Sequence, residues 1–213
     1  MIGVVDYGMG NLHSVSRALE RLGHHYFISG DAEELVAKSD GLILPGVGAF
    51  PDAMKELDRQ GLTNMLKTWA NDGRPLLGIC LGMQLLLERS EEHGHTTGLC
   101  LLPGHVYRFS GETSEGTTYK VPHMGWNLLR YHKEDHPMLQ EVEPGHVYFV
   151  HSYVASVEED VLIASAEYDV LVPAVIGREN VWGTQFHPEK SSDIGMRMLK
   201  NFAKAVEEGS GRV

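Results

Sequence analysis

The sequence predicts an α/β fold of a single domain, in which helices flank a largely parallel central sheet that is extended by antiparallel strands. In the first half of the chain, short apolar runs alternate with amphipathic segments, which is typical of parallel strands joined by helical crossovers. In the second half, β-rich stretches are separated by turns. The length of 213 residues suits one domain with a sizeable core.

The first half of the chain supplies the parallel strands and the helices between them. Apolar runs predict strands at 2–6, 24–29, 41–46 and 75–79. Amphipathic spacing predicts helices at 11–23, 31–39, 51–59 and 61–71, with another that begins at 81. Ligands of such sheets bind at the carboxyl ends of the strands, so the loops that follow these strands are where we expect a site.

The second half predicts the added strands and a terminal helix. β-rich stretches lie at 105–110, 146–157, 161–168, 173–179 and 181–186. From Ser191 onward, one helix face would carry Ile194, Met198, Leu199, Phe202 and Val206. Because no internal repeat, low-complexity tract or linker interrupts the chain, we expect one domain over residues 1–213.

Composition excludes several classes of partner. Eighteen Lys and Arg against 29 Asp and Glu give a formal net charge of −11, which repels nucleic acid and anionic lipid. The N-terminus does not read as a signal peptide, and no apolar run approaches the roughly 18 residues of a membrane span. Two cysteines argue against a disulfide scaffold, and no His/Cys cluster has zinc spacing. We therefore expect a cytoplasmic protein without a metal site.

The first candidate for chemistry is the stretch PLLGICLGMQ, residues 75–84. Cys80 lies between Gly78 and Gly82 after a predicted strand and before a predicted helix, which is the cysteine form of a nucleophile elbow. N–H groups at the helix start favour a thiolate there, and the N–H of Leu81 can face an oxyanion. Most free cysteines are inert packing residues, so this stretch alone leaves both interpretations open.

A thiol nucleophile needs an imidazole and a group that orients it. In GTQFHPEK, residues 183–190, His187 ends a β-like stretch and Glu189 follows two residues later. That carboxylate can accept a hydrogen bond from the imidazole N–H that faces away from the sulfur. On its own, the tripeptide His-Pro-Glu (187–189) is also typical of a surface turn.

Two glycine-containing loops follow other predicted strands. In LPGVGAF, residues 44–50, glycines allow backbone N–H groups to approach a substrate, although the same residues suit an ordinary turn. DYGMGN, residues 6–11, lacks the third glycine of a dinucleotide fingerprint, so we reject a nucleotide site. The conjunction of strand-end loops, cysteine and His-x-Glu is far more specific than any of its members.

These residues resemble the class I, triad-type glutamine amidotransferases. Three blocks carry the resemblance in the order typical of that family: PGVGAF (45–50), GICLGMQLL (78–86) and GTQFHPEKS (183–191). Three further stretches are similar to the glutaminase subunits of imidazole glycerol phosphate synthases of histidine biosynthesis: DYGMGN (6–11), VPHMGWN (121–127) and YFVHSY (148–153). The resemblance spans essentially the whole chain and implies one flavodoxin-like domain that needs no cofactor.

The resemblance also implies a role for each candidate residue. Cys80 would attack the side-chain amide carbon of L-glutamine to form a γ-glutamyl thioester. His187, oriented by Glu189, would protonate the departing ammonia and then activate the hydrolytic water. The backbone of Val47, Gly48 and Leu81 would hold the oxyanion. The substrate-contacting positions would be Gly46, Gln84, His151, Ser152 and Tyr153.

The implied partner is the synthase (cyclase) subunit, a (β/α)8 barrel in a heterodimer with this chain. Ammonia would pass to it through a channel and yield imidazole glycerol phosphate and aminoimidazole carboxamide ribotide. The partner-facing positions would be Asn11, His123, Met124, Trp126, Asn127 and Lys190. Core packing for Trp126 and a solvated charge for Lys190 are the alternatives. A peptide flip within Pro45–Gly48 would explain activation by the partner.

Three other interpretations stay open. Amidotransferase subunits for anthranilate, guanylate or pyridoxal phosphate synthesis share the triad, but VPHMGWN and HSY disfavour them. An α/β cysteine peptidase would cleave peptides and ignore free glutamine. A non-catalytic binding module would be unaffected by Cys80→Ala.

Overall fold

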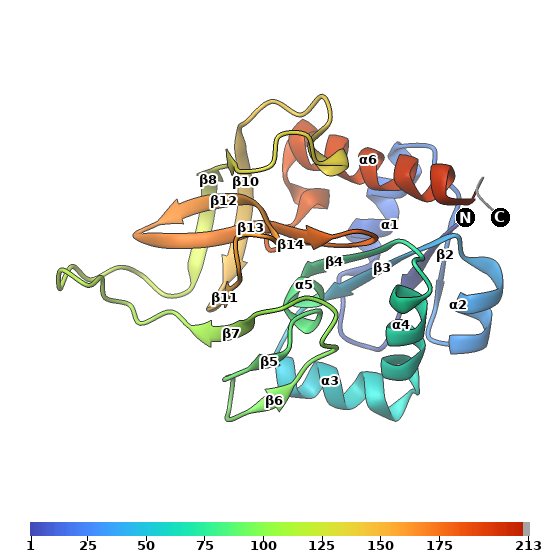
Figure 1. The fold of residues 1–213 in the computed structure, drawn as a ribbon, viewed down its shortest axis with the longest axis horizontal. Coiled ribbons are helices and arrows are strands. Elements are labelled where there is room, and N and C mark those ends of the chain that lie inside the picture. Colours follow the sequence, from blue (N-terminus) through green and yellow to red (C-terminus); the bar gives the residue numbers. More distant parts are fainter. Residues whose placement is uncertain (211–213) are drawn as a thin grey trace.

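An eight-stranded sheet crosses the molecule in the computed structural model, which describes residues 1–210 (Figure 1). Its strands, in spatial order, are β2 (Tyr26–Ser29), β1 (Ile2–Val5), β3 (Gly41–Gly46), β4 (Leu76–Cys80), β14 (Val181–Thr184), β13 (Val170–Arg178), β12 (Leu162–Tyr168) and β9 (Arg130–Tyr131). The first five are parallel, and the pairs from β14 to β9 are antiparallel. The predicted α/β fold with a largely parallel sheet and added antiparallel strands is confirmed.

Helices cover both faces of this sheet. The longer helices are α1 (Leu12–Arg21), α2 (Ala32–Lys38), α3 (Phe50–Arg59), α4 (Leu62–Asn71) and α6 (Ser192–Ser210). In Figure 1, α1 and α6 lie on one side of the sheet and α2, α3 and α4 on the other. The sequence defines their starts, because the Asn11 and Asp31 side chains accept backbone N–H groups in the first turns of α1 and α2.

The central strands bury side chains on both faces. Along β4 and its neighbour β3, Leu77 and Ile43 belong to the core beneath α1 and α6, whereas Leu76 and Leu44 belong to the core beneath the other helices. Such strands read as continuous apolar runs rather than alternating ones, which is why they could be recognised in the sequence.

Two smaller sheets stand beyond the carboxyl ends of β3 and β4 (Figure 1). One pairs β8 (His123–Leu128) with β10 (His146–His151). The other contains β11 (Tyr153–Ser156), β7 (His105–Arg108), β5 (Arg89–Ser90) and β6 (Thr96–Thr97). Short 3-10 helices form at Pro137–Leu139 (η1) and Pro188–Lys190 (η2).

The structure differs from the sequence prediction, or adds to it, at three places. The stretch 146–157 forms two strands in different sheets, because the chain changes sheets at Ser152, whose carbonyl accepts the Phe109 N–H. The segment β8 was not predicted as a strand. The helix that begins at Leu81, α5 (Leu81–Leu85), has only five residues, because carbonyls at its end accept N–H groups from residues 99–102.

The expected domain of residues 1–213 includes 211–213, which lie outside the described residues. Among the helices of residues 1–210, none is long and apolar enough to cross a membrane.

Candidate active site

A pocket of about 450 Å³ opens where the carboxyl ends of β3 and β4 face the two smaller sheets. Its walls are Val47, Gly48, Cys80, Leu81, Gln84, Glu92, Pro122, Val150, His151, Ser152, Tyr153 and His187. Segments far apart in the sequence therefore meet at the edge of the sheet where a site was expected.

Cys80 is the last residue of β4 and sits directly before α5. Its backbone is in a sparsely populated conformation, with φ 55° and ψ −111°. A Cβ atom on Gly82 would overlap the carbonyl oxygen of Leu44, and one on Gly78 would lie 2.6 Å from the carbonyl oxygen of Gly82. The two glycines are thus required for the tight turn that presents the cysteine.

His187 reaches the same pocket from the segment after β14. Its backbone N–H donates to the carbonyl of Tyr148 on β10, at 3.1 Å. Its Nδ1 lies 2.8 Å from Oε1 of Glu189, whose side chain is fully buried. The Nδ1 contact leaves Nε2 as the nitrogen that faces Cys80. In space, the imidazole therefore lies between the cysteine and the carboxylate.

The charge state of His187 follows from its two neighbours. Burial by itself would lower the pKa of the ring, but the hydrogen bonds and charges of Cys80 and Glu189 outweigh it and raise the pKa to about 9. The ring is therefore protonated at neutral pH, where it can act as a proton donor beside the sulfur.

Gln185 contacts the nucleophile, and sequence reasoning missed this residue. Its Nε2 donates to Sγ of Cys80 at 3.8 Å, and its Oε1 accepts from Nε2 of Gln84 at 2.9 Å. The side chain is fully buried. Its position within GTQFHPEK was the only available signal, and glutamine is not a residue type that suggests triad chemistry.

The glycine loop after β3 lies beside the cysteine. Gly48 has φ +104°, and Gly46 pairs directly with Cys80 between β3 and β4. The N–H of Val47 donates to the carbonyl of Met9 at 3.3 Å, so in this conformation it is already used within the protein. Gly46 is buried beneath the pocket rather than part of its wall.

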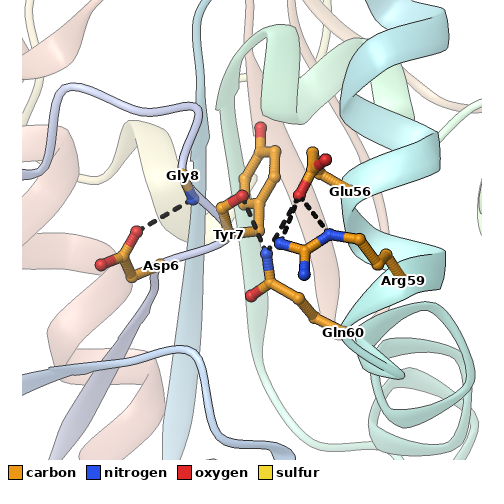
Figure 2. A network of polar contacts seen from close by, with 6 residues as sticks. All are labelled: Asp6, Tyr7, Gly8, Glu56, Arg59 and Gln60. Atoms are coloured by element: carbon orange, nitrogen blue, oxygen red, sulfur yellow. Dashed lines mark hydrogen bonds and ion pairs between the residues drawn. The ribbon is translucent and has the colours of Figure 1, made fainter.

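The loop after β1, whose Met9 carbonyl accepts the Val47 N–H, is held by the polar contacts drawn in Figure 2. Nε2 of Gln60 donates to the carbonyl of Tyr7, and the N–H of Gly8 donates to Asp6. The Tyr7 ring is buried, and its hydroxyl has no hydrogen-bond partner among the described residues. Burial, together with the charge of Cys80, raises the pKa of Tyr7.

Most of the predicted substrate positions line the pocket. Gln84, His151, Ser152 and Tyr153 do so, whereas Gly46 does not. Glu92, which sequence reasoning missed, adds a buried carboxylate to the wall and accepts the Phe50 N–H at 2.8 Å. In the sequence, SEEHG reads as an acidic surface turn, and only the tertiary fold brings it to the pocket.

The predicted partner-facing residues divide into exposed and buried ones. Met124 and Trp126 are 60% and 50% exposed, so core packing is wrong for this tryptophan. Asn11 and Asn127 are half-buried, and Lys190 is exposed. The expectation that His123 faces a partner needs correction. This ring is fully buried, because β8 turns it inward against Phe149 and Tyr168.

No group of three or more His, Cys, Asp or Glu side chains within residues 1–210 is arranged to hold a metal ion.

Comparisons with known proteins agree with this geometry. The family model for "Glutamine amidotransferase class-I" matches residues 3–206. The chain is 61% identical over 210 residues to the imidazole glycerol phosphate synthase subunit HisH of Halalkalibacterium halodurans, covering 98% of each chain. It is 55% identical over 209 residues to the subunit of the same name in Bacillus subtilis, again covering 98% of each.

Solved structures share the fold at low sequence identity. A crystal structure of a glutamine amidotransferase superposes with a TM-score of 0.76 at 21% identity, covering 97% of this chain and 98% of the other. A chain of PurLQS from Thermotoga maritima superposes with a TM-score of 0.74 at 20% identity, covering 96% and 98%.

Proposed function

Because the chain belongs to the class I glutamine amidotransferases, and within them to the HisH subunits of imidazole glycerol phosphate synthase, we propose that it hydrolyses L-glutamine and delivers ammonia for imidazole glycerol phosphate synthesis. The reaction belongs to histidine biosynthesis. We assign it to one domain over residues 1–213, acting in the cytoplasm.

The observation that carries the proposal is the alignment of Cys80, His187 and Glu189 at one pocket. A pKa of about 9 for His187 favours an ion pair with the sulfur at neutral pH. The sulfur attacks the side-chain amide carbon, and a C–S bond forms. His187 then gives its proton to the departing nitrogen, which leaves as ammonia when the C–N bond breaks.

The second half of the reaction uses the same ring in its other role. Having lost its proton, His187 accepts one from a water molecule that attacks the γ-glutamyl thioester. The C–S bond breaks, glutamate leaves, and the thiolate–imidazolium pair is restored. Glu189, 2.8 Å from Nδ1, holds the ring in the same orientation through both steps.

The oxyanion would be held by backbone N–H groups of Leu81 and of the Val47–Gly48 segment. Because the N–H of Val47 donates to Met9 in this conformation, the peptide must turn before it can serve. The positive φ of Gly48 marks the position best suited to such a rotation. We assign the low activity expected without the partner to this occupied donor.

The substrate's polar ends match the pocket wall. Glu92 presents a buried carboxylate suited to the α-ammonium group of glutamine. Both N–H groups of the Gln84 amide are used, by Tyr153 and Gln185, so its oxygen is the group that remains for the substrate.

The synthase subunit, which we take to be a (β/α)8 barrel, would dock on an apolar surface formed by Met124, Trp126, Leu128 and Leu171. These side chains are 50–60% exposed. Trp126 packs on Tyr148, whose carbonyl accepts the His187 N–H. A partner that contacts Trp126 is therefore linked to His187 through Trp126 and Tyr148 alone.

The test is synthesis by the complex of this chain with its synthase subunit, using either glutamine or ammonium salt as nitrogen source. Cys80→Ala is expected to lower glutamine-dependent synthesis by a factor of roughly 10³ or more and to leave ammonium-dependent synthesis unchanged. Cys100→Ala, at the chain's other cysteine, is the matched control and should retain both activities. Unchanged glutamine-dependent synthesis by Cys80→Ala would contradict the proposal, as would peptide cleavage without glutamine hydrolysis.

A further inference from the structure

A line of buried polar groups leads from strand β8 to the sulfur of Cys80. Its members are His123, His151, the carbonyl of Tyr153, Gln84 and Gln185, and the four side chains are at most 7% exposed. Each is joined to the next by a hydrogen bond of 2.7–3.1 Å, and the last reaches the sulfur at 3.8 Å.

The direction of these bonds is fixed from the middle outward. Gln84 donates both of its N–H groups to oxygens, to the carbonyl of Tyr153 at 3.1 Å and to Oε1 of Gln185 at 2.9 Å. Since Oε1 of Gln185 is the acceptor, its NH₂ group must point the other way, toward Sγ of Cys80. The hydrogen bond from Gln84 therefore fixes the orientation of the Gln185 amide, whose NH₂ group donates to the sulfur.

The histidine end is fixed by the same carbonyl. Nδ1 of His151 lies 2.7 Å from the oxygen of Tyr153 and must donate to it. Burial, with the nearby charges of His123 and His187, lowers the pKa of His151 to about 3, so the ring is neutral and its Nε2 carries no proton. Nδ1 of His123 lies 2.9 Å from this nitrogen, which brings the two rings into direct contact.

His123 is held in place by its surroundings. Its ring stacks between Tyr168 and Phe149, with centroid distances of 3.9 and 4.7 Å. Its Nε2 lies 2.8 Å from Oδ1 of Asn127, one residue from the exposed Trp126. The line of hydrogen-bonded groups thus begins directly beneath the apolar surface that contains Trp126.

We propose that this hydrogen-bonded chain positions the sulfur of Cys80 for attack, with Gln185 as its contact to the sulfur and His123, His151 and Gln84 as positioning residues. A donor to the sulfur favours the thiolate and fixes its direction toward the pocket. Docking on β8 would act on the nucleophile through the same groups. The inference rests on the proposed glutaminase function and adds residues to it.

The first experiment replaces Gln185 with methionine, which keeps length and volume but has no N–H donor. Two readouts apply: the alkylation rate of Cys80 by iodoacetamide in the isolated protein at pH 7, followed by mass spectrometry, and steady-state glutaminase kinetics in the complex. We expect Gln185→Met to lower both the alkylation rate and kcat by roughly 10- to 100-fold, the range for a lost hydrogen bond to a charged group, while KM changes little. Asn201→Ala is the control and should change neither, because it removes a side-chain amide on α6 that is not part of the hydrogen-bonded chain.

The second experiment tests whether the groups act as a unit. His123→Phe keeps an aromatic ring in the stack and removes the nitrogen that contacts His151, and it is combined with Gln185→Met in a double-mutant cycle. We expect the two changes together to cost clearly less than the product of the single effects. If thermal unfolding shows that His123→Phe does not fold, Asn127→Ala at the half-buried end of the chain replaces it.

The outcomes separate this inference from the function on which it rests. Wild-type alkylation and kcat in Gln185→Met would overturn it even if the native complex hydrolyses glutamine. Independent, multiplicative effects in the cycle would equally overturn it. Absence of glutaminase activity in the native complex would contradict the proposed function instead, since the alkylation arm reads the sulfur without any substrate.

Discussion

The charge on His187 sets the pH range in which the site works. Its pKa is raised to about 9, above the ordinary value of about 6.5, by contacts that exist only in the folded protein. The associated stabilisation is therefore fully present below about pH 6.5 and is lost as pH rises through 9. Proton donation to the leaving nitrogen should fail over the upper part of the same range.

We predict that kcat/KM for glutamine falls above about pH 9, and that Glu189→Gln moves this alkaline limb to lower pH. The neutral amide removes the charge and the acceptor that hold the proton on His187. The measurement is a pH–rate profile of both proteins in complex with the synthase. An alkaline limb at the same pH in both would show that Glu189 does not tune the ring.

We predict that Tyr7→Phe raises the free energy of unfolding by about 1 kcal/mol. The Tyr7 hydroxyl is buried without a partner among residues 1–210, so removing it relieves a desolvation cost and leaves the packing unchanged. Urea unfolding at neutral pH measures the difference, with Tyr107→Phe at a half-buried ring as comparison. A loss of 1 kcal/mol instead would mean that the hydroxyl has a partner.

At the residue scale, sequence motifs predict site residues when the residue type and its spacing indicate the chemistry. Cys80, His187 and Glu189 were predicted because glycine spacing and a near carboxylate each have a local physical reason. Gln185 and Glu92 were not, since their roles depend on segments that meet only in the folded chain. His123 was expected to face a partner from the resemblance alone, and only the folded chain shows that it is buried against Phe149 and Tyr168.

At the scale of elements, the elbow between β4 and α5 is the most constrained. We predict that Gly82→Ala lowers the free energy of unfolding by about 3 kcal/mol or more, because its Cβ would overlap the backbone carbonyl of Leu44, which cannot rotate away. Denaturant unfolding measures the change. Gly73→Ala, at an exposed turn with open space, is the comparison and should show only the backbone strain of its φ of +76°.

The elements that sequence patterns missed share a physical cause. The parallel strands are buried on both faces, so their apolar runs identify them regardless of neighbours. Strand β8, HMGWNL, follows a proline, contains a glycine and exposes Met124, Trp126 and Leu128, so its alternation is inverted from the usual order. The break at Ser152 is invisible because both strands around it have equally strong β character.

At the scale of the whole molecule, the apolar surface on β8 and β13 should govern assembly. We predict that Trp126→Ala changes the free energy of unfolding by no more than about 0.5 kcal/mol but weakens binding of the synthase subunit by about 2 kcal/mol, close to 30-fold in Kd. Calorimetric titration of the two subunits measures this. Equal affinity in both proteins would place the docking surface elsewhere, and Val36→Ala, an exposed apolar side chain on α2, serves as control.

The nucleophile lies on β4, whereas the Val47–Gly48 oxyanion donors lie on the loop after β3. These two segments should differ in their rates of hydrogen exchange. Backbone amides of β4 lie in the middle of the parallel sheet between two cores, so they should exchange with deuterated solvent as slowly as any in the protein. The amides of Gly48 and Ala49, which are exposed and half-buried beside the pocket, should exchange orders of magnitude faster. The nucleophile is then carried by the slowest-opening part of the chain, and the oxyanion donors by one of the fastest. Adjustment of the site by a partner can therefore occur without any opening of the sheet that holds the sulfur.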